Sequence, residues 1–325
     1  MARAVTVVMP AYNVTPYIGT ALDSVFAQTV RDVEVIVVND GCPDTPNLER
    51  VLDAYASRII YIRQDNEGVG SARRTAIDAA STPLIAQLDP DDWWERDYLA
   101  VQLRLLEASG GADLIYPNGY YFGRPDMEGR LLMEYSPSEG DVTFLSAMAM
   151  KVNIIYSALI RREAILRAGN FDPKFRTSED FDLWMRMLKT GARISYHREP
   201  LLHYRLRRKS LTSGAIAVHE WLLQVLDKLE TVLDLSAEER AALLARRANV
   251  QMELELARGK EAIQQRQWRD ARWHLQLYRN SNPSKKISAA LALLRCCPWI
   301  LGAGMAVQKR LLGSGLLKAK PQRMV

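Results

Sequence analysis

The sequence predicts an α/β fold in which a mostly parallel sheet with mixed edge strands precedes an α-helical C-terminal region. Short β-branched apolar runs alternate with segments of helical periodicity over residues 5–88, as expected for strands joined by crossover helices. Acidic residues stand at the ends of two of these runs. From about residue 216 onward the periodicity is helical only.

The first half of the chain can be divided into elements in order. The strands are continuous apolar runs, as in parallel sheets that are covered on both faces, and the first helix shows an apolar face at Ile18, Leu22 and Val25. The expected elements are a strand at Val5–Met9, a helix after Pro16, a strand at Val33–Val38, a helix at Leu48–Tyr55, a strand at Ile59–Ile62, a helix at Val69–Ala80 and a strand at Leu84–Leu88. Leu114–Tyr116 and Ile154–Leu159 are expected to extend the sheet as mixed edge strands.

Further elements follow the sheet. Ser178 suits the N-cap of a helix that runs to about Lys189, because acidic residues fill its first turn. Ala192–Ser195 suits one more strand. Apolar stripes around Trp221–Leu229 and Glu238–Ala257 indicate two helices, and Ala257–Leu277 resembles a single tetratricopeptide-like hairpin.

Charge divides the chain into unequal parts. Residues 1–203 carry 21 basic and 28 acidic side chains, a net charge of −7, whereas residues 204–325 carry 22 and 10, a net charge of +12. No acidic residue follows Asp270. We therefore expect three parts: a catalytic-type domain at 1–215, a helical appendix at 216–280 and a basic amphipathic tail at 281–325.

The tail could meet a membrane in more than one way. Ile287–Val307 is 21 residues long with one charge, Arg295, which is enough to span a bilayer, but Pro298 and two glycines interrupt it. A helix lying in a membrane interface fits better, and a helix pair packed on the domain is the alternative. No nucleic-acid partner is expected.

The cysteines indicate a reducing compartment. Cys42, Cys296 and Cys297 are odd in number and lack metal-ligand spacing, and the N-terminal apolar run is too short for a signal peptide. We expect a cytoplasmic chain, with a peripheral position on the inner face of the membrane if the tail binds lipid.

Acidic residues at two strand ends predict a metal site. Asp40 follows the second apolar run, and Asp89, Asp91 and Asp92 follow the run that ends at Leu88. The carboxyl ends of parallel strands line the crevice in which open α/β sheets bind ligands. Clustered carboxylates repel one another unless they share a cation, and oxygen ligands suit Mn²⁺ or Mg²⁺. A cation there suggests a substrate that carries a diphosphate.

Two alternative interpretations of these motifs have to be considered. The three acids could cap a helix before Trp93, although one carboxylate would be enough for a cap. The stretch Gly68-Val69-Gly70 could belong to a dinucleotide fold, but that fingerprint follows the first strand, which here ends in Pro10-Ala11-Tyr12-Asn13 without glycine. A Rossmann dehydrogenase is therefore disfavoured.

Five motifs in order resemble those of the family 2 inverting glycosyltransferases of the GT-A type. They are Val-Met-Pro-Ala-Tyr-Asn at 8–13, Val-Val-Asn-Asp-Gly at 37–41, Asn-Glu-Gly-Val-Gly-Ser-Ala-Arg at 66–73, Leu-Asp-Pro-Asp-Asp at 88–92 and Ser-Glu-Asp-Phe-Asp-Leu-Trp at 178–184. Each motif alone is weak, but each falls at an expected element boundary. The resemblance covers about residues 4–210 and implies a GT-A nucleotide-binding domain.

The resemblance implies roles at the donor site. Pro10, Ala11 and Tyr12 would contact the nucleoside, with the Tyr12 ring on the base or, alternatively, in the core. Asp40 would accept from the imide N–H of uracil, or else cap the following turn. Arg73 would meet the base or diphosphate as a fixed donor fork, or form a surface salt bridge.

The remaining roles concern metal and catalysis. The resemblance implies that one or two of Asp89, Asp91 and Asp92 hold the divalent cation and that the others, Asp89 among them, grip the ribose. Asp180 is the candidate general base, and Glu179 and Asp182 are its competitors.

Acceptor and leaving-group contacts are the least determined by the sequence. Trp184 shares a helical face with Asp180 and could be an acceptor platform or a core residue. Family members often carry a histidine after the Tyr-Arg pair, where this chain has Arg207. Arg205 or Arg207 could instead offset the leaving-group charge.

The predicted activity is metal-dependent, inverting transfer of a sugar from a UDP-sugar to a hydroxyl of a glycan or lipid-linked acceptor, in cell-surface polysaccharide or lipopolysaccharide synthesis. A nucleotidyltransferase would need a glycine-rich basic loop after the first strand, and Pro10–Val14 is not one. A non-catalytic nucleotide-sugar-binding or scaffold protein with a docking tail remains the alternative. The donor sugar, linkage and oligomeric state do not follow from the sequence.

Overall fold

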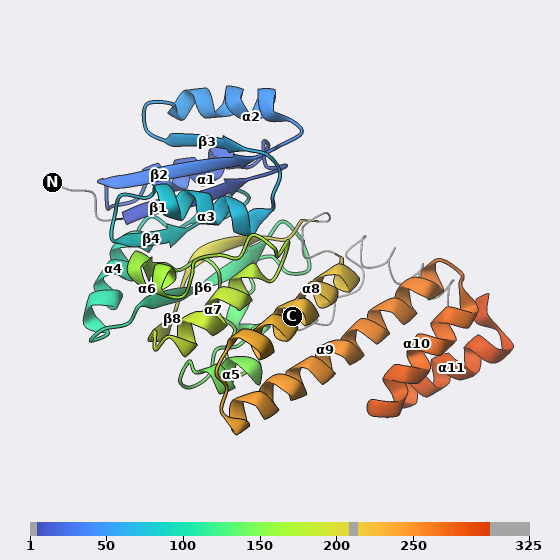
Figure 1. Cartoon of the computed structure of the whole chain (residues 1–325). Coiled ribbons are helices and arrows are strands. Elements are labelled where there is room, and N and C mark those ends of the chain that lie inside the picture. Colours follow the sequence, from blue (N-terminus) through green and yellow to red (C-terminus); the bar gives the residue numbers. More distant parts are fainter. Residues whose placement is uncertain (1–4, 208–213, 300–325) are drawn as a thin grey trace.

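The computed structural model describes residues 5–207 and 214–299 as an eight-stranded sheet with covering helices, followed by a helical extension (Figure 1). The strand order is β3-β2-β1-β4-β7-β6-β8-β5. Four parallel strands form one half of the sheet, namely β1 (Val5–Ala11), β2 (Val33–Asp40), β3 (Ile60–Gln64) and β4 (Leu84–Gln87). This half agrees with the strands that the apolar runs predict.

The second half of the sheet is mixed. It contains β5 (Trp93–Trp94), β6 (Leu114–Phe122), β7 (Leu159–Arg161) and β8 (Ile194–Arg205). Strand β7 is antiparallel to both β4 and β6, β6 is parallel to β8, and β5 is antiparallel to β8. The structure thus confirms a mostly parallel sheet with mixed pairing.

Two strands are placed differently from the sequence expectation. Strands β6 and β7 lie inside the sheet rather than at its edges, which are β3 and β5. The apolar stretch from Ile154 is irregular up to Ala158, and only its end becomes β7. Periodicity cannot distinguish a buried loop from a buried strand, because both are continuously apolar.

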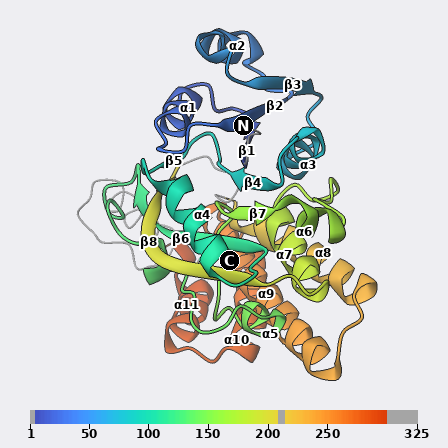
Figure 2. The same cartoon turned by 90° about the vertical axis from the view of Figure 1, so that its left-hand side faces the viewer.

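Helices cover both faces of the parallel half. Figure 2 shows α1 (Ile18–Phe26) and α3 (Val69–Ala79) on opposite sides of β1 and β2. The remaining helices of this part are α2 (Thr45–Leu52), α4 (Tyr98–Ala108), α5 (Phe144–Met148), α6 (Arg162–Arg167) and α7 (Glu179–Lys189), with 3-10 turns at Asp53–Tyr55 and Leu132–Glu134. Residues of β1, β2 and β4 that are almost fully buried form the centre of the core.

The C-terminal helices extend away from the sheet (Figure 1). They are α8 (Ala215–Val232), α9 (Ala237–Gln264), α10 (Trp268–Ser281) and α11 (Lys285–Cys296). Helix α8 and the first part of α9, up to Val250, belong to the same hydrophobic core as the sheet. A second, smaller core joins the end of α9 to α10 and α11, and includes Ala262, Ala271 and Leu275 of the expected hairpin.

The tail is described only in part. Among residues 5–207 and 214–299, no helix is both long enough and apolar enough to cross a membrane. The segment Ile287–Val307 continues beyond Trp299, where the description ends, so its second half lies outside the described residues. The division of the chain at residues 215 and 280 stays a prediction.

Candidate active site

The candidate site lies at the carboxyl edge of the parallel strands. Strands β1 and β2 run in register to Ala11 and Asn39, and β4 pairs with β1 so that its chain leaves the sheet beside them. Asp40 ends β2, and Asp89 follows β4 by two residues. Parallel pairing therefore brings the two acidic groups predicted from the sequence to one edge of the sheet.

A cavity of about 230 Å³ at this edge gathers most of the predicted side chains. The predicted residues on its wall are Arg73, Asp89, Asp91, Asp92, Glu179, Asp180, Arg205 and Arg207. They come from α3, the segment after β4, the start of α7, and β8 with the two residues after it. Pro10, Ala11, Tyr12, Asp40 and Trp184 do not line this cavity.

Arg73 is the central cation of the site. It is only 3% exposed, donates to Asp89 over 2.7 Å and forms a short ion pair with Glu179. Burial opposes its charge, but Asp89 and Glu179 outweigh burial and raise its pKa. The surface salt bridge considered for Arg73 is thus excluded, and the side chain connects the two acidic segments inside the protein.

The three clustered aspartates have separate partners. Asp91 pairs with Arg207 over 2.6 Å, and Asp92 accepts from the Arg205 backbone over 2.7 Å and from the Tyr156 hydroxyl. Burial, and then the neighbouring aspartates, raise the pKa of both Asp91 and Asp92 above the usual range. A strand, β5, follows these residues at once, so they do not cap a helix.

The donor set fits a divalent cation that substrate would complete. Within the described part of the chain, no three His, Cys, Asp or Glu side chains converge on one point. Mg²⁺, however, binds through one or two carboxylates plus substrate phosphates and water. Asp89 and Asp91 each use one carboxylate oxygen in an ion pair, with Arg73 and Arg207 respectively, and the other oxygen of each is available to a cation.

Asp180 lies where the two cavities meet. It lines the site cavity and also a second cavity behind it, and its carboxylate accepts from the Phe181 N–H over 2.7 Å. Burial is the main cause of a raised pKa at Asp180, and also at Glu179, where the pKa rises to about 7. Asp182 is excluded as a competing base because it is fully buried and paired with Arg186 and Lys228.

The turn before α7 is strained. Ser178 occupies the N-cap position as expected, but its φ is +60° and its side chain makes no capping hydrogen bond. A left-handed serine costs free energy that its surroundings must supply, and such residues concentrate at functional sites. The strained turn presents Glu179 and Asp180 to the cavity.

The predicted nucleoside residues differ in accessibility. Pro10 and Ala11 are buried in β1, whereas Tyr12 is 40% exposed and so is not a core aromatic. Asp40 is 3% exposed and accepts from the Glu67 and Gly68 backbone N–H groups, each over 2.9 Å. Asp40 therefore orders the loop that leads into α3, rather than only the turn that follows it.

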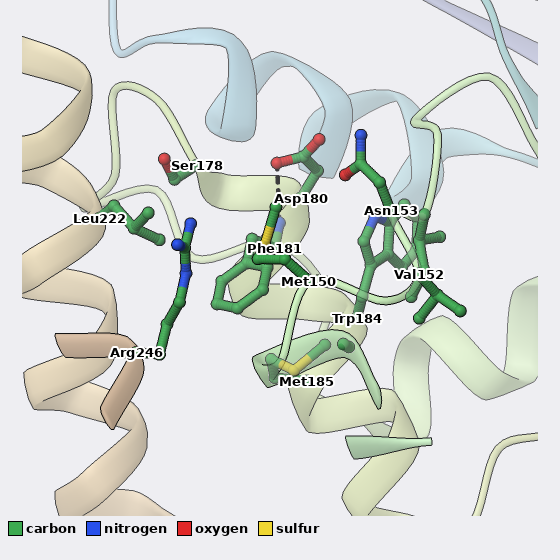
Figure 3. A pocket seen from close by; sticks show the side chains of 12 residues that line it. Met150, Val152, Asn153, Ser178, Asp180, Phe181, Trp184, Met185, Leu222 and Arg246 are labelled. Carbon is green, nitrogen blue, oxygen red and sulfur yellow. Dashed lines mark hydrogen bonds between the residues drawn. The ribbon is translucent and has the colours of Figure 1, made fainter. Parts of the chain in front are cut away.

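Trp184 is both a core residue and a cavity wall. It is 1% exposed, packs edge-on against Phe171 and lines the second cavity of about 80 Å³. Figure 3 shows its indole below Asp180 and Asn153. It does not line the larger cavity, so an acceptor reaches it only by way of the second one.

Arg205 ends β8, and Arg207, two residues later, stands where family members often carry a histidine. Arg205 donates to the Asp91 carbonyl over 2.8 Å, and both Arg205 and Arg207 face the Tyr17 ring. His203 instead stacks on Trp93 and pairs with Glu95 over 2.7 Å, away from the site cavity. Two guanidinium groups therefore lie beside Asp91, one in contact with its carbonyl and the other with its carboxylate.

Four residues of the site were missed by sequence reasoning. Tyr156 and Tyr204 border the aspartates and have pKa values raised first by burial and then by those carboxylates. Asn153 joins the two cavities, and Arg246 enters the second one from α9. For Arg246 a signal existed, because it interrupts the apolar stripe of Leu243, Val250 and Leu254.

Comparison with known proteins finds similar sequences. The Glycosyl transferase family 2 profile matches residues 6–167. An uncharacterized glycosyltransferase of Rickettsia typhi is 27% identical over 224 residues, 65% of this chain and 67% of that protein. Glycosyltransferase GlyA of Streptococcus pneumoniae is 27% identical over 254 residues, 74% of this chain but only 34% of GlyA.

Solved structures show the same fold. Residues 1–349 of S. aureus TarS in complex with UDP-GlcNAc superpose with a TM-score of 0.62 at 16% identity, over 94% of this chain and 91% of that one. Mannosyltransferase PcManGT from Pyrobaculum calidifontis, in complex with GDP-Man and Mn²⁺, gives 0.58 at 17% identity, over 98% and 87%.

These findings define the class of protein. The sheet, with acids at the carboxyl ends of its parallel strands, is a GT-A fold. The chain belongs to glycosyltransferase family 2, and it is a glycosyltransferase.

Proposed function

We propose that this glycosyltransferase moves a sugar from a UDP-sugar to a hydroxyl group of a glycan or lipid-linked acceptor, with inversion at the anomeric carbon. The observation that carries the proposal is the 230 Å³ cavity, whose wall combines Asp89 and Asp91 with Arg205, Arg207 and Asp180. The two aspartates and the two arginines suit the binding of a diphosphate together with its metal ion, and Asp180 suits the role of general base.

The uridine part of the proposal rests on Tyr12 and Asp40. The exposed Tyr12 ring at the end of β1 can stack on a base, and Asp40 lies on the neighbouring strand. Asp40 Oδ2 accepts a hydrogen bond from the Gly68 N–H, which leaves a second lone pair for the imide N–H of uracil. The TarS complex with UDP-GlcNAc supports uridine, and the PcManGT complex with GDP-Man makes guanosine the alternative.

The chemical step assigns a proton and an electron pair. The acceptor oxygen attacks the anomeric carbon while Asp180 takes the hydroxyl proton, and the bond from that carbon to the diphosphate oxygen breaks. The electron pair leaves with the diphosphate, where Arg205 and Arg207 supply compensating charge. The raised pKa of Asp180 makes its carboxylate a stronger base than an ordinary aspartate.

A divalent cation is part of the proposal. Asp89 and Asp91 would hold Mn²⁺ or Mg²⁺, which when bound would neutralise charge on the departing diphosphate. Arg73 keeps Asp89 in place through the 2.7 Å ion pair, so the protein positions one ligand before any substrate arrives. Asp92, with both oxygens engaged, supports the loop instead.

We propose that the basic tail, residues 281–325, docks on an anionic membrane surface. No acidic residue follows Asp270, and Trp299, three residues after α11, is 68% exposed. Cationic side chains with exposed tryptophan are typical of helices that lie on membranes. This location would place the enzyme beside a lipid-linked acceptor, in line with cell-surface polysaccharide or lipopolysaccharide synthesis.

The proposal is tested by incubating the purified protein with Mn²⁺ and a panel of UDP-sugars and GDP-sugars and measuring release of the nucleoside diphosphate. Donors that release UDP are then paired with simple glycosides, and the anomeric configuration of the product is read by NMR. A product with inverted configuration supports the proposal. Retention of configuration would contradict the role of Asp180, and turnover of only GDP-sugars would contradict the uridine assignment.

A further inference from the structure

The cavity behind Asp180 contains a buried cation. Arg246, in the middle of α9, is 6% exposed and lines this cavity of about 80 Å³. Its neighbours on the same helical face are Leu243 and Val250, both fully buried, so an apolar residue would ordinarily occupy its position. Local rules of this kind are broken mainly at functional sites.

The guanidinium of Arg246 lacks a close partner. Its Nε is buried without a hydrogen bond, and within residues 5–207 and 214–299 no ion pair of Arg246 is formed. Glu253, two turns along α9, is the acid that acts on it electrostatically, but that carboxylate lies 3.4 Å from His219. Arginine stays charged in proteins, so a nearly unpaired buried guanidinium is costly unless a ligand pairs with it.

A second donor lies in the same cavity. The indole Nε1 of Trp184 is also buried without a hydrogen-bond partner. In Figure 3 the Arg246 side chain reaches toward Ser178 and Phe181, and the Trp184 ring lies on the far side of Phe181 below Asp180. The Arg246 and Trp184 side chains can only donate hydrogen bonds, so a ligand that pairs with either of them must be an acceptor.

The cavity is connected to the site of chemistry. Asn153, Ile154, Ser178 and Asp180 line both this cavity and the larger one. A volume of 80 Å³ equals roughly two or three water molecules at about 30 Å³ each, which suits a compact oxyanion. Arginine forks bind carboxylate and phosphate groups with two parallel hydrogen bonds.

We propose that this cavity is an oxyanion subsite, in which Arg246 pairs with a carboxylate or phosphate group of the acceptor while a neighbouring hydroxyl of the acceptor reaches Asp180. The inference deepens the proposed function, on which its acceptor part rests. It predicts an anionic acceptor, such as a sugar acid or a phosphate-bearing glycan, rather than a neutral one.

The test measures thermal unfolding of the full chain with UDP and Mn²⁺ present, so that the donor site is not available to the probe. The probes are glycerol 1-phosphate, lactate and glycerol at matched ionic strength. In the wild type, one of the two anions should raise the Tm in a saturable way and glycerol should not. The anion that acts distinguishes phosphate from carboxylate.

Variants locate the effect. Arg246→Met should abolish the anion-dependent rise in Tm and should itself have a Tm at or above that of the wild type, because it removes a buried unpaired charge. Arg240→Met, which removes an exposed cation of α9, should behave like the wild type. Arg246→Lys should show a smaller anion-dependent rise in Tm than the wild type. It replaces Arg246→Met in the test if that variant fails to fold.

Two results would overturn the subsite: no anion effect in the wild type, or the same effect in the Arg246 variants and the wild type. A titration with UDP separates this outcome from failure of the proposed function. An anion effect that depends on Arg246 in a protein that does not bind UDP would leave the subsite standing and contradict the donor assignment.

Discussion

At the scale of single residues, Asp180 carries the proposed chemistry. We expect Asp180→Asn to lower transfer about 10²- to 10⁴-fold, the usual contribution of a general base, while UDP binding is kept. Because the base acts deprotonated and burial raises its pKa, the wild-type rate should fall as pH falls through that raised pKa, above the usual 3.8. The pH profile of UDP release in the presence of acceptor measures both effects.

Glu179→Gln is the matched control for Asp180. Glu179 is also buried with a raised pKa, but it is ion-paired with Arg73. Glu179→Gln should weaken donor binding, because Arg73 loses one of its two ion-pair partners. The fall of the transfer rate at low pH, the acid limb of the profile, should remain. If the acid limb disappears in Glu179→Gln and persists in Asp180→Asn, the base is Glu179.

Asp92 supports a prediction about stability. Its pKa is raised well above the usual value, chiefly by burial and then by Asp91 and Asp89. The protonated carboxyl stabilises the folded state, and this contribution is complete at pH values below the pKa of the group in the unfolded chain, near 3.8. It is lost as pH rises through the higher pKa that the group has in the folded state. Asp92→Asn, measured in EDTA at pH 7, should therefore be more stable than the wild type, because it removes the buried charge and keeps a side chain of the same size.

The gain in Asp92→Asn should shrink toward pH 4, where the wild-type carboxyl is protonated. Asp97→Asn removes an exposed carboxylate nearby, one that makes no side-chain cap bond to α4, and should change stability little. Denaturant unfolding of the three proteins at two pH values gives the comparison. Equal stability of wild type and Asp92→Asn at pH 7 would show that Asp92 is not strained by its charge.

At the scale of elements, α7 is held against α8 by Lys228. Its ammonium lies 2.8 Å from both Asp172 and the fully buried Asp182. Lys228→Met leaves Asp182 with Arg186 as its remaining cation, so we expect a loss of about 3 kcal/mol, typical of breaking a buried ion pair.

The control for Lys228 is Arg247→Met on α9. Arg247 pairs with Asp227 over 2.8 Å, but both side chains are about half exposed, and such pairs contribute less than about 1 kcal/mol. Urea unfolding compares the two variants. Equal losses would mean that the pairing of Lys228 does not anchor α7, the helix that presents Asp180.

At the scale of the whole molecule, the basic C-terminal part should bind anionic membranes. A chain truncated after Asn280 should lose sedimentation with vesicles that contain phosphatidylserine and keep UDP binding. Added salt should weaken binding of the full chain, because the attraction is electrostatic. Absence of sedimentation for the full chain would refute the interfacial interpretation.

The sequence predicted the structure where the hydrophobic periodicity of a segment and the position of its polar residues indicate the same element. The parallel strands, α3 and the hairpin of α9 and α10 follow from apolar patterns, and the aspartates follow from their places after strands. The sequence did not reveal that β6 and β7 lie inside the sheet, because order in a sheet depends on long-range pairing. Nor did it show that Arg73 is buried between Asp89 and Glu179, since its partners lie 16 and 106 residues away in the chain.

The most direct test of the account is calorimetric titration of the purified chain with UDP, with and without Mn²⁺, beside Asp91→Asn and with GDP as the competing nucleotide. The account predicts that UDP binds more tightly with Mn²⁺, that Asp91→Asn loses the gain due to Mn²⁺, and that GDP binds more weakly. Binding that ignores Mn²⁺ would contradict the metal site at Asp89 and Asp91. Preference for GDP would contradict the contact between Asp40 and uracil, and no nucleotide binding would contradict the central claim.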